Sequence, residues 1–208
     1  MSTPRRAALR AFGVVACAAV TLAILRPWTV QPIQTAQPRT FDAVAYVDDA
    51  WPRTVQEAEG TAVTVVAARA AAVAPAAAGA PTSLRPVFVK VTGVVTDVDR
   101  RSRVGVAQVQ GDAGERVAVQ VGPVLRGTAL RDALGFVRFT DFANQTEFAA
   151  IANAFNDRVL RDVVAPIDLD ALKGRTLTIV GAAVVPAAGN DAAIDVVPVV
   201  MRVEGGTK

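Results

Sequence analysis

The chain has 208 residues, 52% of them hydrophobic and only 5% aromatic, which suffices for one domain whose core rests on aliphatic side chains and a few phenylalanines. It has no histidine and a single cysteine, Cys17. These counts exclude an intrachain disulfide, a histidine-based catalytic triad and a metal site built from thiols and imidazoles, so we expect neither a metal nor a cofactor.

The positive charge of the chain is concentrated near its N-terminus. Four of the 22 cations precede residue 27: Arg5, Arg6, Arg10 and Arg26. No acid precedes Asp42, so residues 27–208 carry 18 cations against 19 anions, a net charge of −1. Because a nucleic-acid-binding domain carries a strong excess of positive charge, we expect no nucleic-acid partner.

Residues 1–26 have the layout of an export signal or membrane anchor, with three arginines before an uncharged run of 15 residues at 11–25. The arginine excess before the run keeps the N-terminus in the cytoplasm, so the domain is expected to face the periplasm from the cell (inner) membrane. Three fates remain open: a retained transmembrane helix, which we favour, lipidation at Cys17, since residues 14–17 resemble a lipobox, and simple cleavage. Residues 27–40 contain three prolines and predict an extended tether.

Residues 41–208 are expected to form a single periplasmic domain that begins with helices. Asp42 is a suitable N-cap for a helix through Trp51. Pro52 fits the first turn of a second helical segment, which residues 62–73 would continue.

Val-rich, alternating runs dominate the chain after a predicted loop at 75–86. Five strands are predicted, at 87–98, 104–109, 116–121, 177–185 and 194–203. Between the third and fourth strands, Asn144 and Glu147 form a capping-box pattern that opens an amphipathic helix. Pro198 in the last strand indicates an edge position or a bulge.

Three strands, a helix and two strands is the element order of the OB fold. We therefore predict an α+β fold, in which N-terminal helices precede a five-stranded antiparallel OB-like β-barrel with a helix between strands three and four. A generic α+β sheet packed on helices is the alternative.

The candidate ligand-binding residues form a polar cluster that begins in a Gly-containing loop. They are Arg126, Thr128, Arg131, Asp132, Asn144, Gln145, Asn153 and Asn156. The arginines could hold a carboxylate or phosphate, while the amides would suit sugar hydroxyls, with Asn153 and Asn156 on one helix face. The alternative, which we favour, is that these side chains cap helices and fix the loop.

The same region carries a family resemblance. Its motifs are Gln120-Val121-Gly122-Pro123-Val124, Arg126-Gly127-Thr128-Ala129-Leu130-Arg131-Asp132, Asp141-Phe142, Asn144-Gln145 and Ala152-Asn153, with Phe41-Asp42 at the start of the domain. With these motifs the chain resembles a bacterial family of predicted periplasmic lipoproteins carrying a domain of unknown function, over nearly all of residues 41–203. The resemblance implies an accessory protein, often encoded beside sugar-type ABC uptake systems, with no catalytic residues to carry over.

Three functions follow as hypotheses. The leading one is a non-enzymatic accessory or binding protein, tethered to the membrane, whose partners are uptake-system components or a small polar ligand. The alternative is a carboxylate-based hydrolase of envelope glycans that uses two of four acids, which are Asp132, Asp141, Glu147 and Asp157. A structural subunit that docks on a membrane partner is the third.

Overall fold

The computed structural model describes residues 41–73, 85–186 and 193–204, all within one unit, Phe41–Lys208. The predicted anchor with Cys17, the tether at 27–40 and most of the predicted loop at 75–86 lie outside the described residues. Within the described ranges, no helix is long and apolar enough to cross a membrane.

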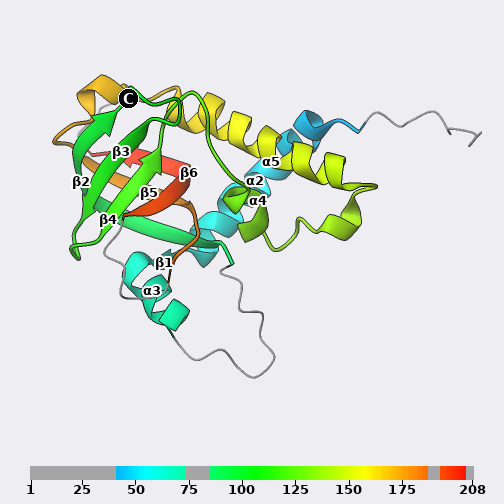
Figure 1. Cartoon of the computed structure of the whole chain (residues 1–208), viewed down its shortest axis with the longest axis horizontal. Coiled ribbons are helices and arrows are strands. Elements are labelled where there is room, and N and C mark those ends of the chain that lie inside the picture. The colour runs from blue at the N-terminus through cyan, green and yellow to red at the C-terminus, as the bar shows by residue number, and fades with distance from the viewer. Residues whose placement is uncertain (1–40, 74–84, 187–192, 205–208) are drawn as a thin grey trace, which may run out of the picture. The chain divides into compact units, whose positions relative to one another are not determined.

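Five strands close into a barrel, which confirms the OB-like prediction (Figure 1). They are β2 (Val87–Asp99), β3 (Val106–Gly111), β4 (Arg116–Gln120), β5 (Thr176–Ala183) and β6 (Ile194–Val203). Around the barrel the order is β2-β3-β4-β6-β5, and β5 pairs with β2 to complete the ring. The first three strands form the expected antiparallel meander.

The prediction of a wholly antiparallel barrel is wrong, because β4 and β6 run parallel, with Val117 opposite Ile194. The reason is geometric: strand directions can alternate around a closed ring only if the number of strands is even. With five strands, at least one neighbouring pair must be parallel. The four remaining pairs of the barrel are antiparallel.

The predicted irregularity at Pro198 is a register shift rather than an edge. The pairing of β5 with β6 shifts between Val180 and Gly181, and Gly181 lies opposite Pro198. β6 has a partner on each side, β4 and β5. Proline lacks the N–H that a regular ladder requires, so the ladder is disrupted at this point.

The N-terminal helices are placed differently from the prediction. α2 runs without interruption through Ala43–Thr61 and contains Pro52, which therefore does not begin a second helix. Its N-cap is Asp42, as expected, whose Oδ1 accepts hydrogen bonds from the N–H groups of Val44 and Ala45, both at 3.0 Å. Next come β1 (Val63–Thr64), which pairs parallel with β2, and α3 (Val65–Val73).

The connection between β4 and β5 holds more than the single helix that was predicted. It contains α4 (Ala129–Ala133), the 3-10 turn η1 (Phe139–Asp141), α5 (Gln145–Val159), the π-helical turn η2 (Leu160–Val164) and the 3-10 turn η3 (Leu169–Ala171). The predicted N-cap of α5 is confirmed, because Asn144 Oδ1 accepts from Glu147 N–H at 2.9 Å. The reciprocal bond of a capping box is displaced by one residue: Glu147 Oε2 accepts from the N–H of Ala143, at 3.0 Å, rather than from that of Asn144.

α5 contributes its apolar face to the core. Ile151, Phe155 and Val159 are fully buried and belong to the same cluster as the inward-facing barrel residues. Figure 1 shows α5 beside α2, and the two helices are in contact. Burial of this stripe, rather than intrinsic helix propensity, accounts for most of the stability of α5.

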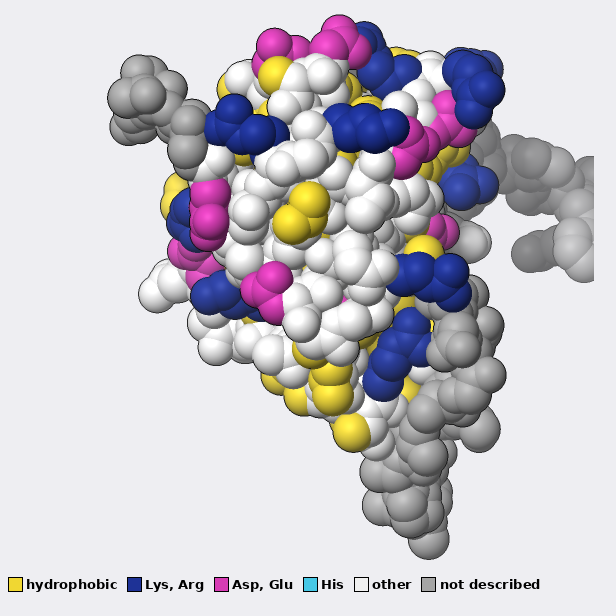
Figure 2. All heavy atoms as spheres, turned by 90° about the vertical axis from the view of Figure 1, so that its left-hand side faces the viewer, with side chains coloured by type: hydrophobic (Ala, Val, Ile, Leu, Met, Phe, Trp, Pro, Cys, Tyr) yellow, Lys and Arg dark blue, Asp and Glu magenta, His cyan; other side chains and the backbone are white. Residues whose placement is uncertain are grey.

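The surface carries both signs of charge. On the face shown in Figure 2, Lys and Arg side chains alternate with Asp and Glu around a largely uncharged centre. Exposed ion pairs such as Arg100–Asp170 and Lys173–Asp97 bring opposite charges together. Such exposed pairs contribute little to stability, about 0–1 kcal/mol each.

Candidate functional site

An open pocket of about 770 Å³ lies where the end of β4, the start of α4 and the facing ends of β5 and β6 meet. Its lining residues are Pro86, Gln120, Arg126, Gly127, Thr128, Ala129, Asp132, Val184, Pro186, Ala193, Ile194, Asp195 and Val197. The polar residues come mainly from the β4–α4 segment and the apolar ones mainly from β5, β6 and their flanks. A ligand here would therefore meet one polar wall and one apolar wall.

Gln120, the last residue of β4, is the buried polar group of this pocket, with only 5% of its surface exposed. Its Oε1 accepts a hydrogen bond from the backbone N–H of Arg126 at 2.8 Å. Because an N–H donor requires an oxygen acceptor, this contact identifies which end of the amide is oxygen. The Gln120 NH2 group forms no hydrogen bond with any described residue, so two donors remain for a ligand or water in the pocket.

Asn156 fixes the loop from the other side. Its Nδ2 donates to the carbonyl oxygen of Gly127 at 3.1 Å, and the side chain is buried. Gly127 has a φ of 87°, a left-handed conformation that favours glycine. The loop that carries Arg126 and Thr128 is thus held by one amide from the barrel and one from α5.

Arg131 and Asp132 form the ion pair beneath this loop. Arg131, which is 9% exposed, pairs with Asp132 Oδ1 at 2.6 Å and donates to the carbonyl oxygen of Phe148 at 2.9 Å. Its guanidinium lies 3.7 Å from the centroid of the Phe148 ring. Thr128 Oγ1 donates to Asp132 Oδ2 at 2.5 Å. Asp132 lines the pocket, but its negative charge is already balanced by Arg131.

Two charged side chains of the pocket have no such partner. The Arg126 guanidinium and the Asp195 carboxylate are exposed and form no ion pair or side-chain hydrogen bond with the residues that the structure describes. Both could bind a ligand without first breaking an internal contact. Arg126 offers a planar set of donors, and Asp195 offers acceptors only.

The structure separates the other predicted residues from this pocket. Asn144 caps α5, Gln145 is exposed, and none of Asn144, Gln145 and Asn153 lines the pocket. Asn153 is exposed whereas Asn156 is buried, so these two amides do not point at one common ligand. Of the eight predicted residues, three line the pocket: Arg126, Thr128 and Asp132.

Sequence reasoning missed Gln120 and Asp195. Gln120 had a detectable signal, because it is a polar residue at the end of the apolar run Val117-Ala118-Val119 and the whole run is buried. Asp195 had none, because it belongs to the last strand and reaches the pocket only through the pairing of β6 with β4.

The carboxylates considered for hydrolysis are mostly engaged in local contacts. Asp132 pairs with Arg131, Glu147 caps α5, and Asp141 Oδ2 accepts from the Arg138 N–H at 3.3 Å. Of the four, only Asp132 lines the main pocket. Nothing in this geometry supports the glycan-hydrolase alternative. In the described ranges, no three His, Cys, Asp or Glu residues are grouped so that they could hold a metal ion.

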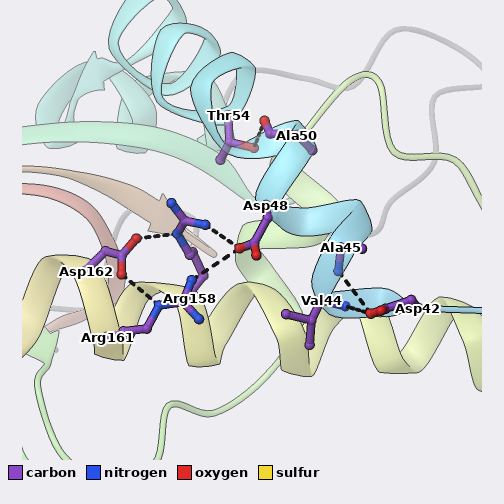
Figure 3. Close-up of polar contacts among 9 residues, drawn as sticks. All are labelled: Asp42, Val44, Ala45, Asp48, Ala50, Thr54, Arg158, Arg161 and Asp162. Atoms are coloured by element: carbon purple, nitrogen blue, oxygen red, sulfur yellow. Dashed lines mark hydrogen bonds and ion pairs between the residues drawn. The ribbon is translucent and has the colours of Figure 1, made fainter.

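A second charge cluster joins α2 to α5 (Figure 3). Arg158 lies between Asp48 of α2 and Asp162 and pairs with both, while Arg161 contacts the same two carboxylates at 3.2 and 2.9 Å. Hydrogen bonding from Arg158, assisted by Arg161, lowers the pKa of the Asp48 carboxyl. This cluster fixes the two helices together and lines none of the pockets described here.

Comparison with solved structures supports the fold. The crystal structure of an OB-fold protein, TM0957 from Thermotoga maritima, is similar with a TM-score of 0.58 and 16% sequence identity, covering 79% of this chain and 99% of that one. The OBody AM3L15 bound to hen egg-white lysozyme covers 60% of this chain and 82% of that one at 17% identity, but its TM-score of 0.30 adds no support for the fold. No curated protein matches the chain.

The sequence itself matches a family of predicted periplasmic lipoproteins, DUF2291, over residues 14–202. That span includes Cys17 and the barrel strands up to residue 202, one residue before the end of β6. The family description indicates an envelope-associated, periplasmic location. The chain belongs to this family of predicted periplasmic lipoproteins, whose function is unknown.

Proposed function

We propose that this protein is a membrane-tethered periplasmic binding protein that holds a small polar ligand in the pocket between the β4–α4 loop and the ends of β5 and β6. The observation that carries this proposal is Gln120, which is nearly buried yet keeps its NH2 donors unused among the described residues. No unpaired buried donor is involved, because Gln120 Nε2 is not among the buried atoms of the described residues that lack a hydrogen-bond partner. What favours binding is the place of this donor group in the lining of the pocket, where a ligand acceptor can reach it.

The surroundings of Gln120 support a ligand of modest size. A volume of about 770 Å³ falls in the range typical of small-molecule sites, which combine apolar walls with a few placed polar groups. The loop over the pocket is held by Gln120 and Asn156, so little ordering is needed on binding. Both features favour a binding site over a structural corner of the barrel.

A lipid on Cys17 is the tether that we favour within this proposal. The family match begins at residue 14 and so includes Cys17, and the family is described as lipoproteins. A thioether-linked diacylglycerol would attach the domain without a membrane-spanning helix. Metabolic labelling with a radioactive fatty acid should label the wild-type protein and not Cys17→Ser; equal labelling of both would exclude this tether.

An accessory role in sugar-type ABC uptake is the wider setting that we propose. It rests on the genomic association implied by the family resemblance. The test is growth of a deletion strain on single carbon sources: a defect restored by wild-type protein, and not by a variant with a blocked pocket, links the pocket to uptake. Normal growth and transport on all substrates would count against it.

The pocket is tested by filling it. Ala193 is exposed and lines the pocket, so Ala193→Phe should occupy ligand space without disturbing the core. Ala149→Phe, on the exposed side of α5 and outside the pocket, is the matched control. We expect a thermal-shift screen of polar metabolites to yield a ligand for the wild type and for Ala149→Phe, and not for Ala193→Phe. A ligand that stabilises all three equally binds elsewhere and refutes the proposal.

A further inference from the structure

The charges around the pocket point to the chemical class of its ligand, an inference that rests on the proposed binding function. A neighbouring hollow of about 560 Å³ shares Pro86 and Asp132 with the main pocket, so the two adjoin, and together they are called the groove here. This hollow adds Arg85 and Arg138, both of which are exposed. Neither forms an ion pair with the described part of the chain.

The groove is therefore cationic although residues 27–208 as a whole carry a net charge of −1. Three arginines, Arg85, Arg126 and Arg138, stand against one unpaired acid, Asp195, because Asp132 is balanced by Arg131. A net positive groove in a nearly neutral domain selects a ligand with net negative charge. A neutral or zwitterionic solute would leave this excess uncompensated.

The hydrogen-bonding groups narrow the class further. Arg126 and the Gln120 NH2 group only donate, so they need acceptors such as carboxylate oxygens. Asp132 and Asp195 only accept at neutral pH, so they need donors, for which hydroxyl groups suffice. Inorganic phosphate offers few hydroxyl donors to these two carboxylates, whereas a hydroxylated acid offers several.

We propose that the groove binds a hydroxylated carboxylic acid of sugar size, such as a uronic or aldonic acid. The carboxylate lies against Arg126 and the Gln120 amide, and the hydroxyl groups donate to Asp195 and Asp132. The carbon skeleton of the ligand rests on the apolar wall, which includes Val184 and Ile194.

The test is calorimetric titration of the full-length protein with three acids, glucuronate, galacturonate and gluconate, alongside glucose, inorganic phosphate and glycine. We expect at least one acid to bind at least tenfold more tightly than the other three probes, and to bind more weakly as salt is raised. Arg126→Gln should weaken that acid by roughly tenfold to a hundredfold, the range for losing a charge-assisted hydrogen bond. Arg103→Gln, an exposed arginine outside the groove, is the matched control and should change nothing.

The outcomes separate this inference from the proposed function. If glucose, phosphate or glycine binds as tightly as the acids and Ala193→Phe abolishes the binding, the acid class is wrong while the pocket still binds ligand. If Arg126→Gln leaves acid binding unchanged, the assignment of the carboxylate is wrong. If none of the acids binds, the inference fails, and the metabolite screen with Ala193→Phe then decides whether the binding function fails with it.

Discussion

Replacing Arg131 by alanine tests whether the ion pair beneath the β4–α4 loop holds the fold together. The Arg131 side chain is 10% exposed and makes three kinds of contact: an ion pair with Asp132, a hydrogen bond to the Phe148 carbonyl and stacking on the Phe148 ring. Asp132, at 33% side-chain exposure, can recover water when its partner is removed. The Phe148 carbonyl loses this side-chain donor and the Phe148 ring loses the guanidinium, while the rings of Phe139 and Phe142 stay beside it.

The magnitude follows from these contacts. A hydrogen bond from a charged donor contributes about 1.5–3 kcal/mol, and a partly desolvated cation–π contact about 1 kcal/mol. Because water can solvate the Asp132 carboxylate once Arg131 is removed, the lost ion pair adds nothing to the expected destabilisation. The expected loss is about 3 kcal/mol, at the lower end of the range found when one partner of a buried ion pair is removed. For a chain of this length, that loss lowers Tm by about 6–12 °C.

Urea unfolding followed by circular dichroism gives the free energy of unfolding for wild type and variant. The matched control is Arg101→Ala, because Arg101 pairs with Asp99 at 3.4 Å yet is 95% exposed, and its loss should change stability by less than about 0.5 kcal/mol. Arg131→Lys keeps the positive charge but not the planar set of guanidinium donors, so it should lower the free energy of unfolding by about half as much as Arg131→Ala. If Arg131→Ala costs no more than Arg101→Ala, the reasoning from burial is refuted.

Three further substitutions have defined outcomes. Gly122→Ala should destabilise by about 2 kcal/mol in the same urea assay, because an added Cβ would lie 2.0 Å from the Val104 carbonyl oxygen, whereas Gly60→Ala, with nothing within 4 Å in helix α2, should stabilise by up to about 1 kcal/mol. Phe155→Ala, at a fully buried site, should cost about 3–5 kcal/mol, and a smaller loss would mean that the core collapses around the cavity. Asp48→Asn should be less stable than the wild type at neutral pH, and this difference should disappear in acid. The pKa of the Asp48 carboxyl is lowered in the folded protein, so the carboxylate stabilises the fold at pH values above its ordinary pKa near 3.8. That stabilisation is lost as the pH falls through the lowered pKa of the folded state. A deficit that stays constant from pH 7 to pH 2.5 would contradict this account.

Local signals predicted the elements that depend on local physics. Asn144 and Glu147 identified the start of α5 because an N-cap is satisfied by a residue three positions along the chain. Pro198 indicated the ladder irregularity because the missing N–H is a property of the residue itself. The prediction at Pro52 was wrong because it, too, relied on a local property of one residue. A proline favours the first turn of a helix when only the sequence is considered, yet α2 continues through it while burying Val47, Thr54 and Ala58 along one side.

The site was less predictable because it depends on contacts between distant strands. Arg126, Thr128 and Asp132 were identified from their own loop, but Asp195 reaches the pocket only through the parallel pairing of β4 with β6. Asn156 has the sequence appearance of a ligand-binding amide, and the structure uses it to hold the Gly127 carbonyl. Helical spacing places residues on a face but does not tell which neighbour that face meets.

The two amides that hold the loop, Gln120 and Asn156, differ in a way that bears on the proposed binding site. Asn156 uses its donor on the Gly127 carbonyl, whereas Gln120 uses its acceptor on the Arg126 N–H and keeps its donors for the pocket. The backbone of Arg126 is therefore fixed while its guanidinium stays uncommitted among the described residues. A ligand gains the guanidinium contact without ordering the loop, so affinity should depend on Asn156 even though Asn156 does not line the pocket.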